Sequence, residues 1–326
     1  MFFQAPAATP APVPEIQFEA SADFLKLPAG MNFGEVAGIA VDGRKHFYAF
    51  VRTGERSTVH GGVASQLFEF GPDGAFIREI GKNLYGFAFA HTVRIGPGGT
   101  IWTTDEGTNM VVEFSPAGRV LMVLGRRAEA VEAPPAEPAP GTQPRPGWGS
   151  FNRPTDVAWD AQGNIYVADG YGNSRIAKFD PNGKYIKSWG SRGSAPGQFN
   201  VPHTMAIDAQ GLIYIGDRQN NRIQVFDGDG NFKTQFVNVG APSAICITPG
   251  PRQFLYASNS NPSTTMDNGE IYKMTLDGKI LGKFGTAGKL LKEFGSVHEM
   301  DCRSENELYV GEITNWRVQK LTLKPR

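Results

Sequence analysis

The chain has 326 residues, is 40% hydrophobic and 20% charged, and carries a formal net charge of zero at pH 7. Without excess charge it has no long-range attraction for nucleic acid or for an anionic membrane surface, so we expect neither as a partner. No apolar run approaches the roughly 20 residues of a transmembrane helix. The 40 glycines and 23 prolines indicate many short strands joined by tight turns.

The N-terminus is a tail rich in proline and alanine, residues 1–14, which we expect to be disordered. It lacks the basic start and long apolar stretch of an intact signal peptide, but it matches the remnant of one that was removed. We therefore favour a secreted or periplasmic protein. The next stretch, Glu15–Leu27, alternates polar and apolar residues and is predicted to be a strand.

Six similar units follow, and each starts from one anchor position. The anchors are Ala37, His91, Thr155, His203, Ser243 and His298. Each anchor precedes a short apolar segment, such as GIAVD or TMAID, and a second strand is predicted to end fourteen residues beyond it. Those ends fall at Val51, Asp105, Asp169, Asp217, Ala257 and Glu312. Turn sequences such as GPDG, DPNG and DGDG then separate further alternating strands.

Four antiparallel strands, repeated every 40 to 64 residues, predict an all-β, six-bladed β-propeller that forms one domain over residues 15–326. The sixth unit has only three strands before the chain ends. We expect the N-terminal strand to complete this last blade and remove its open edge. Two segments interrupt the period, a Pro-rich loop at 126–148 and an insert at 261–268.

Only two cysteines are present, Cys246 and Cys302, which lie three and four residues beyond their anchors. This difference puts them on opposite faces of their strands. We therefore expect two buried free thiols.

Histidine occupies every second anchor, at His91, His203 and His298, although the chain has only five histidines in all. In a closed ring these three lie about 120° apart and point at one axis. Three imidazoles with one open position form a catalytic zinc arrangement, so the sequence predicts a zinc site. Iron, cobalt, copper or manganese would use the same ligands.

Three further side chains lie at the predicted ends of second strands, at the same mouth as the anchors. Arg52 and Arg218 occupy equivalent places on units one and four, and their guanidinium groups are suited to clamp a carboxylate. Tyr171 lies one position further along on unit three. Three other arginines recur after an Asn, and we expect them to act structurally between blades: Arg175, Arg222 and Arg317.

The segments ADGYGNSRIAKF and GDRQNNRIQVF resemble NHL repeats. More specifically, the chain resembles the peptidyl-α-hydroxyglycine α-amidating lyase family in a stand-alone, bacterial-type form without a copper monooxygenase domain. The matching stretches cover residues 30 to 325 and include VAGIAVD with AFVR, FAHTV with IWTTDEG, VADGYGNSRI, FNVPHTMAID with GDRQNNRIQ, and VHEMD with YVGE.

This resemblance implies functional roles for nine residues. It implies zinc ligands at His91, His203 and His298, a base at Tyr171, substrate-binding arginines at Arg52 and Arg218, and a calcium held by the backbone of Ile39 and Val93 and by Glu299. The family's usual acidic calcium ligand is an aspartate, one carbon shorter than Glu299. The family's disulfide beside the tyrosine is also missing, because Gly172 stands there.

The resemblance implies cleavage of the N–C bond of a peptidyl-α-hydroxyglycine, or of a similar carbinolamide, to an amide and glyoxylate. Tyr171, near a cation and an arginine, is expected to have a lowered pKa and to take the hydroxyl proton. The substrate would be a peptide C-terminus or a small molecule, and the protein a monomer. Two alternatives remain, a lactonase-like metal-dependent hydrolase and a non-catalytic NHL-repeat binding module.

Overall fold

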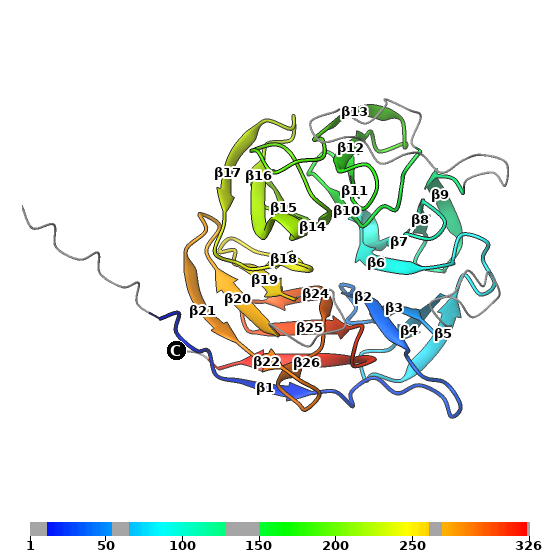
Figure 1. Cartoon of the computed structure of the whole chain (residues 1–326). Helices are drawn as coiled ribbons and strands as arrows, with labels where there is room; N and C mark the ends of the chain where they lie inside the picture. Colours follow the sequence, from blue (N-terminus) through cyan, green and yellow to red (C-terminus); the bar gives the residue numbers. More distant parts are fainter. Residues whose placement is uncertain (1–11, 54–64, 128–149, 261–268, 325–326) are drawn as a thin grey trace, which may run out of the picture.

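The computed structural model describes residues 12–53, 65–127, 150–260 and 269–324. Within these ranges, six four-stranded antiparallel sheets are arranged as blades around one axis (Figure 1). The predicted all-β six-bladed propeller is therefore confirmed. The inner strands β2, β6, β10, β14, β18 and β24 lie nearest the axis.

The strands follow the predicted order along the chain. Blades one to three contain β2 (Glu35–Val41), β3 (Phe47–Arg52), β4 (Gln66–Phe70), β5 (Phe76–Ile80), β6 (Ala90–Ile95), β7 (Ile101–Asp105), β8 (Met110–Phe114), β9 (Val120–Gly125), β10 (Asp156–Trp159), β11 (Ile165–Asp169), β12 (Arg175–Phe179) and β13 (Tyr185–Trp189). Blades four to six contain β14 (Pro202–Ile207), β15 (Ile213–Asp217), β16 (Arg222–Phe226), β17 (Phe232–Phe236), β18 (Ile245–Ile247), β19 (Leu255–Asn259), β20 (Glu270–Met274), β21 (Ile280–Phe284), β24 (Val297–Ser304), β25 (Glu307–Glu312), β26 (Arg317–Leu323) and β1 (Phe18–Ser21). Outside the blades lie two short strands, β22 (Thr286–Ala287) and β23 (Glu293–Phe294), and two 3-10 turns, η1 (Pro97–Gly99) and η2 (Arg218–Asn220).

The N-terminal strand closes the ring as predicted. β1 pairs with β26 in the antiparallel sense, which completes the sheet β1-β26-β25-β24. The strand is shorter than the predicted 15–27. It is held by the ladder and by Phe18, which is buried against Phe284 with ring centroids 5.2 Å apart. Of the predicted tail, residues 1–11 lie outside the described residues, and the Pro14 carbonyl accepts from the Lys283 N–H at 2.9 Å. Nearly all of the Pro-rich loop 126–148, and the whole insert 261–268, also lie outside.

The apolar core is divided into six layers, one in each gap between neighbouring blades. Because both faces of a blade are covered, its inner strand is largely buried on both sides, and all seven residues of β2 are buried. No helix among the described residues is long and apolar enough to cross a membrane.

The two cysteines form a disulfide, so the prediction of two free thiols is wrong. Cys246 on β18 and Cys302 on β24 belong to the same layer, between blades five and six, with Cα atoms 6.1 Å apart. The two residues do point to opposite faces of equivalent strands. In neighbouring blades of a ring, however, opposite faces are the ones that meet. The offset that seemed to separate the sulfur atoms is therefore what brings them together.

Buried carboxylates lie fourteen residues beyond several anchors. They accept hydrogen bonds from the backbone of the segment that precedes the inner strand of the same blade. The backbone N–H of Asn200 donates to Asp217 at 2.7 Å, and that of Gly295 donates to Glu312 at 2.8 Å. Arginines pair with these same carboxylates and bind carbonyls of the linker between blades. Such pairs are Arg175 with Asp169, Arg222 with Asp217 and Arg317 with Glu312. The three recurring arginines are structural, as predicted.

Candidate metal centre

The three anchor histidines sit at β-bulges of their inner strands. In β6, β14 and β24 the pairing register shifts across His91, His203 and His298. A bulge leaves one residue outside the ladder and re-aims its side chain. The histidine at each bulge is almost completely buried, with exposed fractions of 0%, 1% and 7%.

The bulges bring the three imidazoles together. Their ring centroids lie 4.6, 4.6 and 4.9 Å apart in the three pairs. One ligand atom from each of His91, His203 and His298 can be chosen so that all three lie within 4.8 Å of one another. Among the described residues, this is the only cluster of metal-ligating side chains with such spacing.

Two of the histidines are oriented by the anchor of the next blade. His203 Nδ1 lies 2.7 Å from the Ser243 carbonyl oxygen, and His298 Nδ1 lies 2.7 Å from the Ala37 carbonyl oxygen. A carbonyl oxygen only accepts, so each Nδ1 carries the proton and donates it. The Nε2 atom of each ring is then unprotonated, which is the form that binds a metal.

The third histidine reaches its neighbouring blade through a hydroxyl group. Thr92 donates its hydroxyl hydrogen to the Thr155 carbonyl oxygen in a short hydrogen bond. His91 Nδ1 lies 3.1 Å from that hydroxyl oxygen and therefore donates to it. All three rings thus offer Nε2 as a lone-pair donor, and this donor set fits zinc.

Burial keeps the three imidazoles neutral. It lowers the pKa of His91 and His203 well below the ordinary value, and it lowers that of His298 to about 3. Neighbouring positive charges act in the same direction: Arg218 on His91 and His203, and Arg52 on His298.

Tyr171 joins the cluster from blade three. Its phenol oxygen lies 3.1 Å from His203 Nε2 and 3.4 Å from His91 Nε2, and it donates because Nε2 accepts. Burial raises the pKa of Tyr171, and the charge of Arg218 lowers it in part. In the metal-free chain the direction is therefore opposite to the predicted lowering.

The two predicted clamp arginines differ in their partners. Arg52 donates to the Ala90 carbonyl oxygen at 2.7 Å and pairs with Glu35 at 3.0 Å, while its guanidinium lies 3.8 Å from the Phe89 ring centre. Arg218 is also buried. Within the described chain its side chain makes one hydrogen bond, to the Tyr171 hydroxyl at 3.4 Å; its guanidinium lies 5.4 Å from the Tyr171 ring centre, and its Nε has no hydrogen-bond partner. A buried guanidinium beside three imidazoles, with no ion pair to a carboxylate of the described residues, is suited to bind an anion.

The predicted calcium residues Ile39, Val93 and Glu299 lie one or two positions beyond the anchors on their inner strands. The backbone N–H groups of Ile39 and Val93 donate to one carboxylate oxygen of Glu299 at 3.0 and 3.1 Å. These residues do meet at one point.

Sequence reasoning missed three residues that support the centre but do not occupy the anchor position of the repeat. These are Thr92, which relays His91; Glu35, which pairs with Arg52; and Arg153, whose guanidinium lies 4.5 Å from the Tyr171 ring centre. Thr92 and Glu35 lie within two residues of an anchor, and this proximity was the only available indication.

Comparisons with known proteins agree with this architecture. The NHL repeat family matches residues 151–179 and 199–226. The structure resembles those of a streptogramin B lyase and of a gluconolactonase from Xanthomonas campestris, and the two alignments include 94% and 98% of this chain. These two structures are covered over 98% and 99% of their length, with TM-scores of 0.57 and 0.59 and identities of 15% and 13%. At such identities the likeness shows the fold alone. The chain is thus an NHL-repeat propeller with a buried three-histidine cluster.

The relatives found by sequence indicate a more specific class of protein than the structural likenesses do. Peptidyl-glycine alpha-amidating monooxygenase A of Xenopus laevis is 30% identical over 309 residues, which is 86% of this chain and 31% of that protein. Peptidyl-alpha-hydroxyglycine alpha-amidating lyase 1 of Drosophila melanogaster is 29% identical over 265 residues, 74% of this chain and 45% of that protein. A probable lyase of the same kind from Caenorhabditis elegans is 31% identical over 169 residues, 48% of this chain and 44% of that protein.

The chain is therefore a homologue of the peptidyl-α-hydroxyglycine α-amidating lyases, as the sequence resemblance predicted. It spans about a third of the length of the amidating monooxygenases that it matches, 31% and 30% for the frog and mouse proteins.

The lowered histidine pKa values predict how the stability of the metal-free protein depends on pH. Because burial keeps these rings neutral when folded, the unfolded chain binds more protons below its ordinary histidine pKa of about 6.5. Stability should therefore fall as the pH falls, by about 2 kcal/mol per histidine at pH 5. Urea unfolding of metal-free protein between about pH 7 and 5 measures this slope. His203→Gln should flatten it, and an unchanged slope would contradict the interpretation. His46→Gln, outside the cluster, is the control.

Proposed function

We propose that this protein is a metal-dependent lyase that cleaves the N–C bond of a peptidyl-α-hydroxyglycine, or of a similar carbinolamide, to give an amide and glyoxylate. The observation that carries the proposal is the convergence of three unprotonated imidazole nitrogens, two of which contact the Tyr171 phenol, with the buried Arg218 guanidinium on that same phenol. The lyase relatives from fly and worm support the reaction class.

His91, His203 and His298 would hold the metal, and zinc is the ion that three neutral imidazoles favour. When bound, zinc supplies Lewis-acid polarisation of the oxygen atoms of the substrate. The Nδ1 hydrogen bonds of the same rings fix their tautomer and orientation, which keeps Nε2 available.

Tyr171 would act as the base and then as the acid. Its deprotonated oxygen takes the proton of the substrate hydroxyl. The electron pair left on that hydroxyl oxygen forms the carbonyl of glyoxylate, and the C–N bond breaks with its electron pair leaving on nitrogen. The departing amide nitrogen then takes the proton back from Tyr171, so the reaction needs no added reactant. Arg218 assists because its charge opposes the effect of burial on the phenol pKa.

The arginines would share the substrate carboxylate unequally. Among the described residues, Arg218 has a single side-chain hydrogen bond and an unpartnered Nε, so it is the main carboxylate ligand in this proposal. Arg52 already binds the Ala90 carbonyl, next to His91, and Glu35. Its larger contribution would be to hold the strand that carries His91.

The two alternative functions, a binding module and a lactonase-like hydrolase, predict different experimental results from those of the lyase. A binding module needs neither an ion nor a base, so bound zinc and a rate effect of Tyr171 would argue against it. A lactonase-like hydrolase would release no glyoxylate. The gluconolactonase likeness is one of fold at 13% identity, and it does not favour that chemistry.

We also propose that the protein works in an oxidising compartment outside the cytoplasm. The Cys246–Cys302 disulfide supports this, because such bonds persist mainly in secreted and periplasmic proteins.

The proposed zinc site predicts a selective loss of metal. Replacing His203 by alanine removes one of three ligands, so the purified variant should retain little zinc, measured by elemental analysis against protein concentration. His46→Ala should keep the wild-type content. Full zinc retention in His203→Ala would end the three-histidine assignment.

The proposed base predicts a rate effect without a structural one. Tyr171→Phe removes one oxygen atom, so zinc content and melting temperature should stay near the wild-type values. Glyoxylate release from a peptide ending in α-hydroxyglycine should fall by roughly 10²–10⁴. A fully active variant would exclude Tyr171 as the base. A zinc-loaded wild type that releases no glyoxylate would exclude the lyase assignment and leave the metal site intact.

The difference between the two arginines predicts two phenotypes. Arg218→Ala should lower kcat/KM by roughly 10–100-fold, the value of a charge-assisted hydrogen bond, with no loss of melting temperature. A substrate whose carboxylate is amidated should be cleaved equally poorly by this variant and the wild type. Arg52→Ala should lower the melting temperature as well, because it removes two buried contacts. Identical phenotypes would contradict the unequal roles.

A further inference from the structure

Glu299 is buried on the inner strand β24, one residue beyond His298, and it links three blades. Its Oε2 accepts the N–H of Ile39 from blade one and of Val93 from blade two. Gly38 permits this approach, since a Cβ there would lie 2.8 Å from Oε2 and 2.6 Å from the Val93 nitrogen. This oxygen of the predicted calcium ligand is therefore occupied by two hydrogen-bond donors.

The other oxygen of Glu299 faces Arg94. Arg94 Nε lies 3.1 Å from Glu299 Oε1, an ion pair without hydrogen-bond geometry, because Nε donates to Asp156 Oδ1 at 3.0 Å. Arg94 Nη2 binds the second oxygen of Asp156 at 2.7 Å. One guanidinium thus meets two carboxylates, whose side chains are 1% and 2% exposed.

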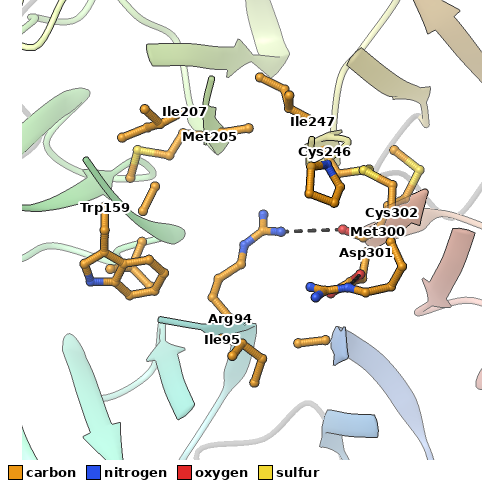
Figure 2. Close-up of a pocket in the computed structure, with 16 residues that line it drawn as sticks. Arg94, Ile95, Trp159, Met205, Ile207, Cys246, Ile247, Met300, Asp301 and Cys302 are labelled. Atoms are coloured by element: carbon orange, nitrogen blue, oxygen red, sulfur yellow. Dashed lines mark hydrogen bonds and ion pairs between the residues drawn. A yellow bond between two sulfur atoms is a disulfide. The ribbon is translucent and has the colours of Figure 1, made fainter. Parts of the chain in front are cut away.

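The residues equivalent to Arg94 in the other blades have shorter side chains, which leaves room for its guanidinium. Arg94 lies three residues beyond its anchor, and the equivalent positions hold Ala40, Ala158, Ala206, Cys246 and Asp301. Figure 2 shows Arg94 extending from β6 into the middle of a cavity with these residues in its wall. The cavity has a volume of about 270 Å³, and the described residues that line it all lie at least two positions past the anchors. It is therefore separate from the histidine cluster at the anchors.

The charge of Arg94 is fixed by its partners. Burial opposes the charged form, but Asp156 and Glu299 outweigh it and raise the pKa of Arg94 above its usual range. The remaining donors reach the Met300 carbonyl at 3.5 Å and the Thr204 hydroxyl at 3.4 Å. Arg94 is therefore a permanent cation that contacts blades three, four and six from blade two.

Calcium does not fit this arrangement. It requires six to eight oxygen ligands at about 2.3–2.6 Å. In a strand the C=O of a residue points to the same edge as its N–H, so the carbonyl groups of Ile39 and Val93 also face the axis. The carboxylate that would neutralise the ion, however, already meets two N–H groups and a guanidinium. A dication beside Oε1 would be repelled by Arg94.

We propose that the Arg94 guanidinium is a built-in cation that takes the place of the calcium implied by the family resemblance, so that this propeller closes its ring without bound calcium. The inference is independent of the proposed lyase activity, because it concerns only which cation neutralises the buried carboxylates of Asp156 and Glu299.

The test compares calcium binding and thermal stability in the zinc-loaded protein, with zinc held constant. Wild type should retain no calcium after desalting, and its melting temperature should not respond to about 1 mM calcium, a level that fills weak extracellular sites. Arg94→Ala leaves Asp156 and Glu299 without their cation. Its melting temperature should start lower and rise with calcium, on the order of 5 °C once calcium is about a hundred times its Kd.

Two variants serve as controls. Arg94→Lys keeps a cation and should respond to calcium no more than wild type. Arg303→Ala removes a guanidinium from the same cavity that pairs with Asp301 rather than Glu299, and it should gain no response. One calcium per chain in the wild type, or an Arg94→Ala protein that folds but ignores calcium, would overturn the proposal. If Arg94→Ala does not fold, the calcium content of the wild type decides the question.

Discussion

The structure depends on closing six blades into a ring, which brings buried polar groups of the inner strands of different blades into contact. Around the axis, polar contacts and one covalent bond link the neighbouring blades. Glu299 joins blade six to blades one and two, and Arg94 with Asp156 joins blade two to blade three. Asp156 accepts from the Met205 N–H of blade four at 2.8 Å.

The last two junctions complete the circle. The N–H of Ile245 in blade five donates to the Thr204 hydroxyl of blade four at 3.3 Å, and the disulfide joins blade five to blade six. An ion pair, hydrogen bonds and a disulfide thus together link the six blades into one ring. Since buried polar groups are costly unless paired, loss of any one of the polar links would leave its partner unsatisfied.

The same closure prepares the histidine cluster. Each ring of the cluster stands at a bulge of an even-numbered blade and is oriented by a carbonyl from the odd-numbered blade that follows it, Thr155, Ser243 or Ala37. The Nε2 atoms converge only when all six blades are in place. Metal affinity and ring closure should therefore be coupled, because both use the same contacts.

The sequence by itself determined the number of blades, the strand order, the closing role of the N-terminal strand and the three histidines. These follow from local patterns: alternation within a strand, turn residues between strands, and a position that recurs along the chain. Tertiary structure decided what each side chain meets. The meeting of Cys246 with Cys302, the pairing of Arg52 with Glu35, and the approach of Arg94 to Glu299 join residues from different strands or blades. Glu299 and Ile39 are 260 positions apart in the chain. No local pattern sets such a distance, because it depends on the angle at which blades pack and on which strand faces meet across the gap.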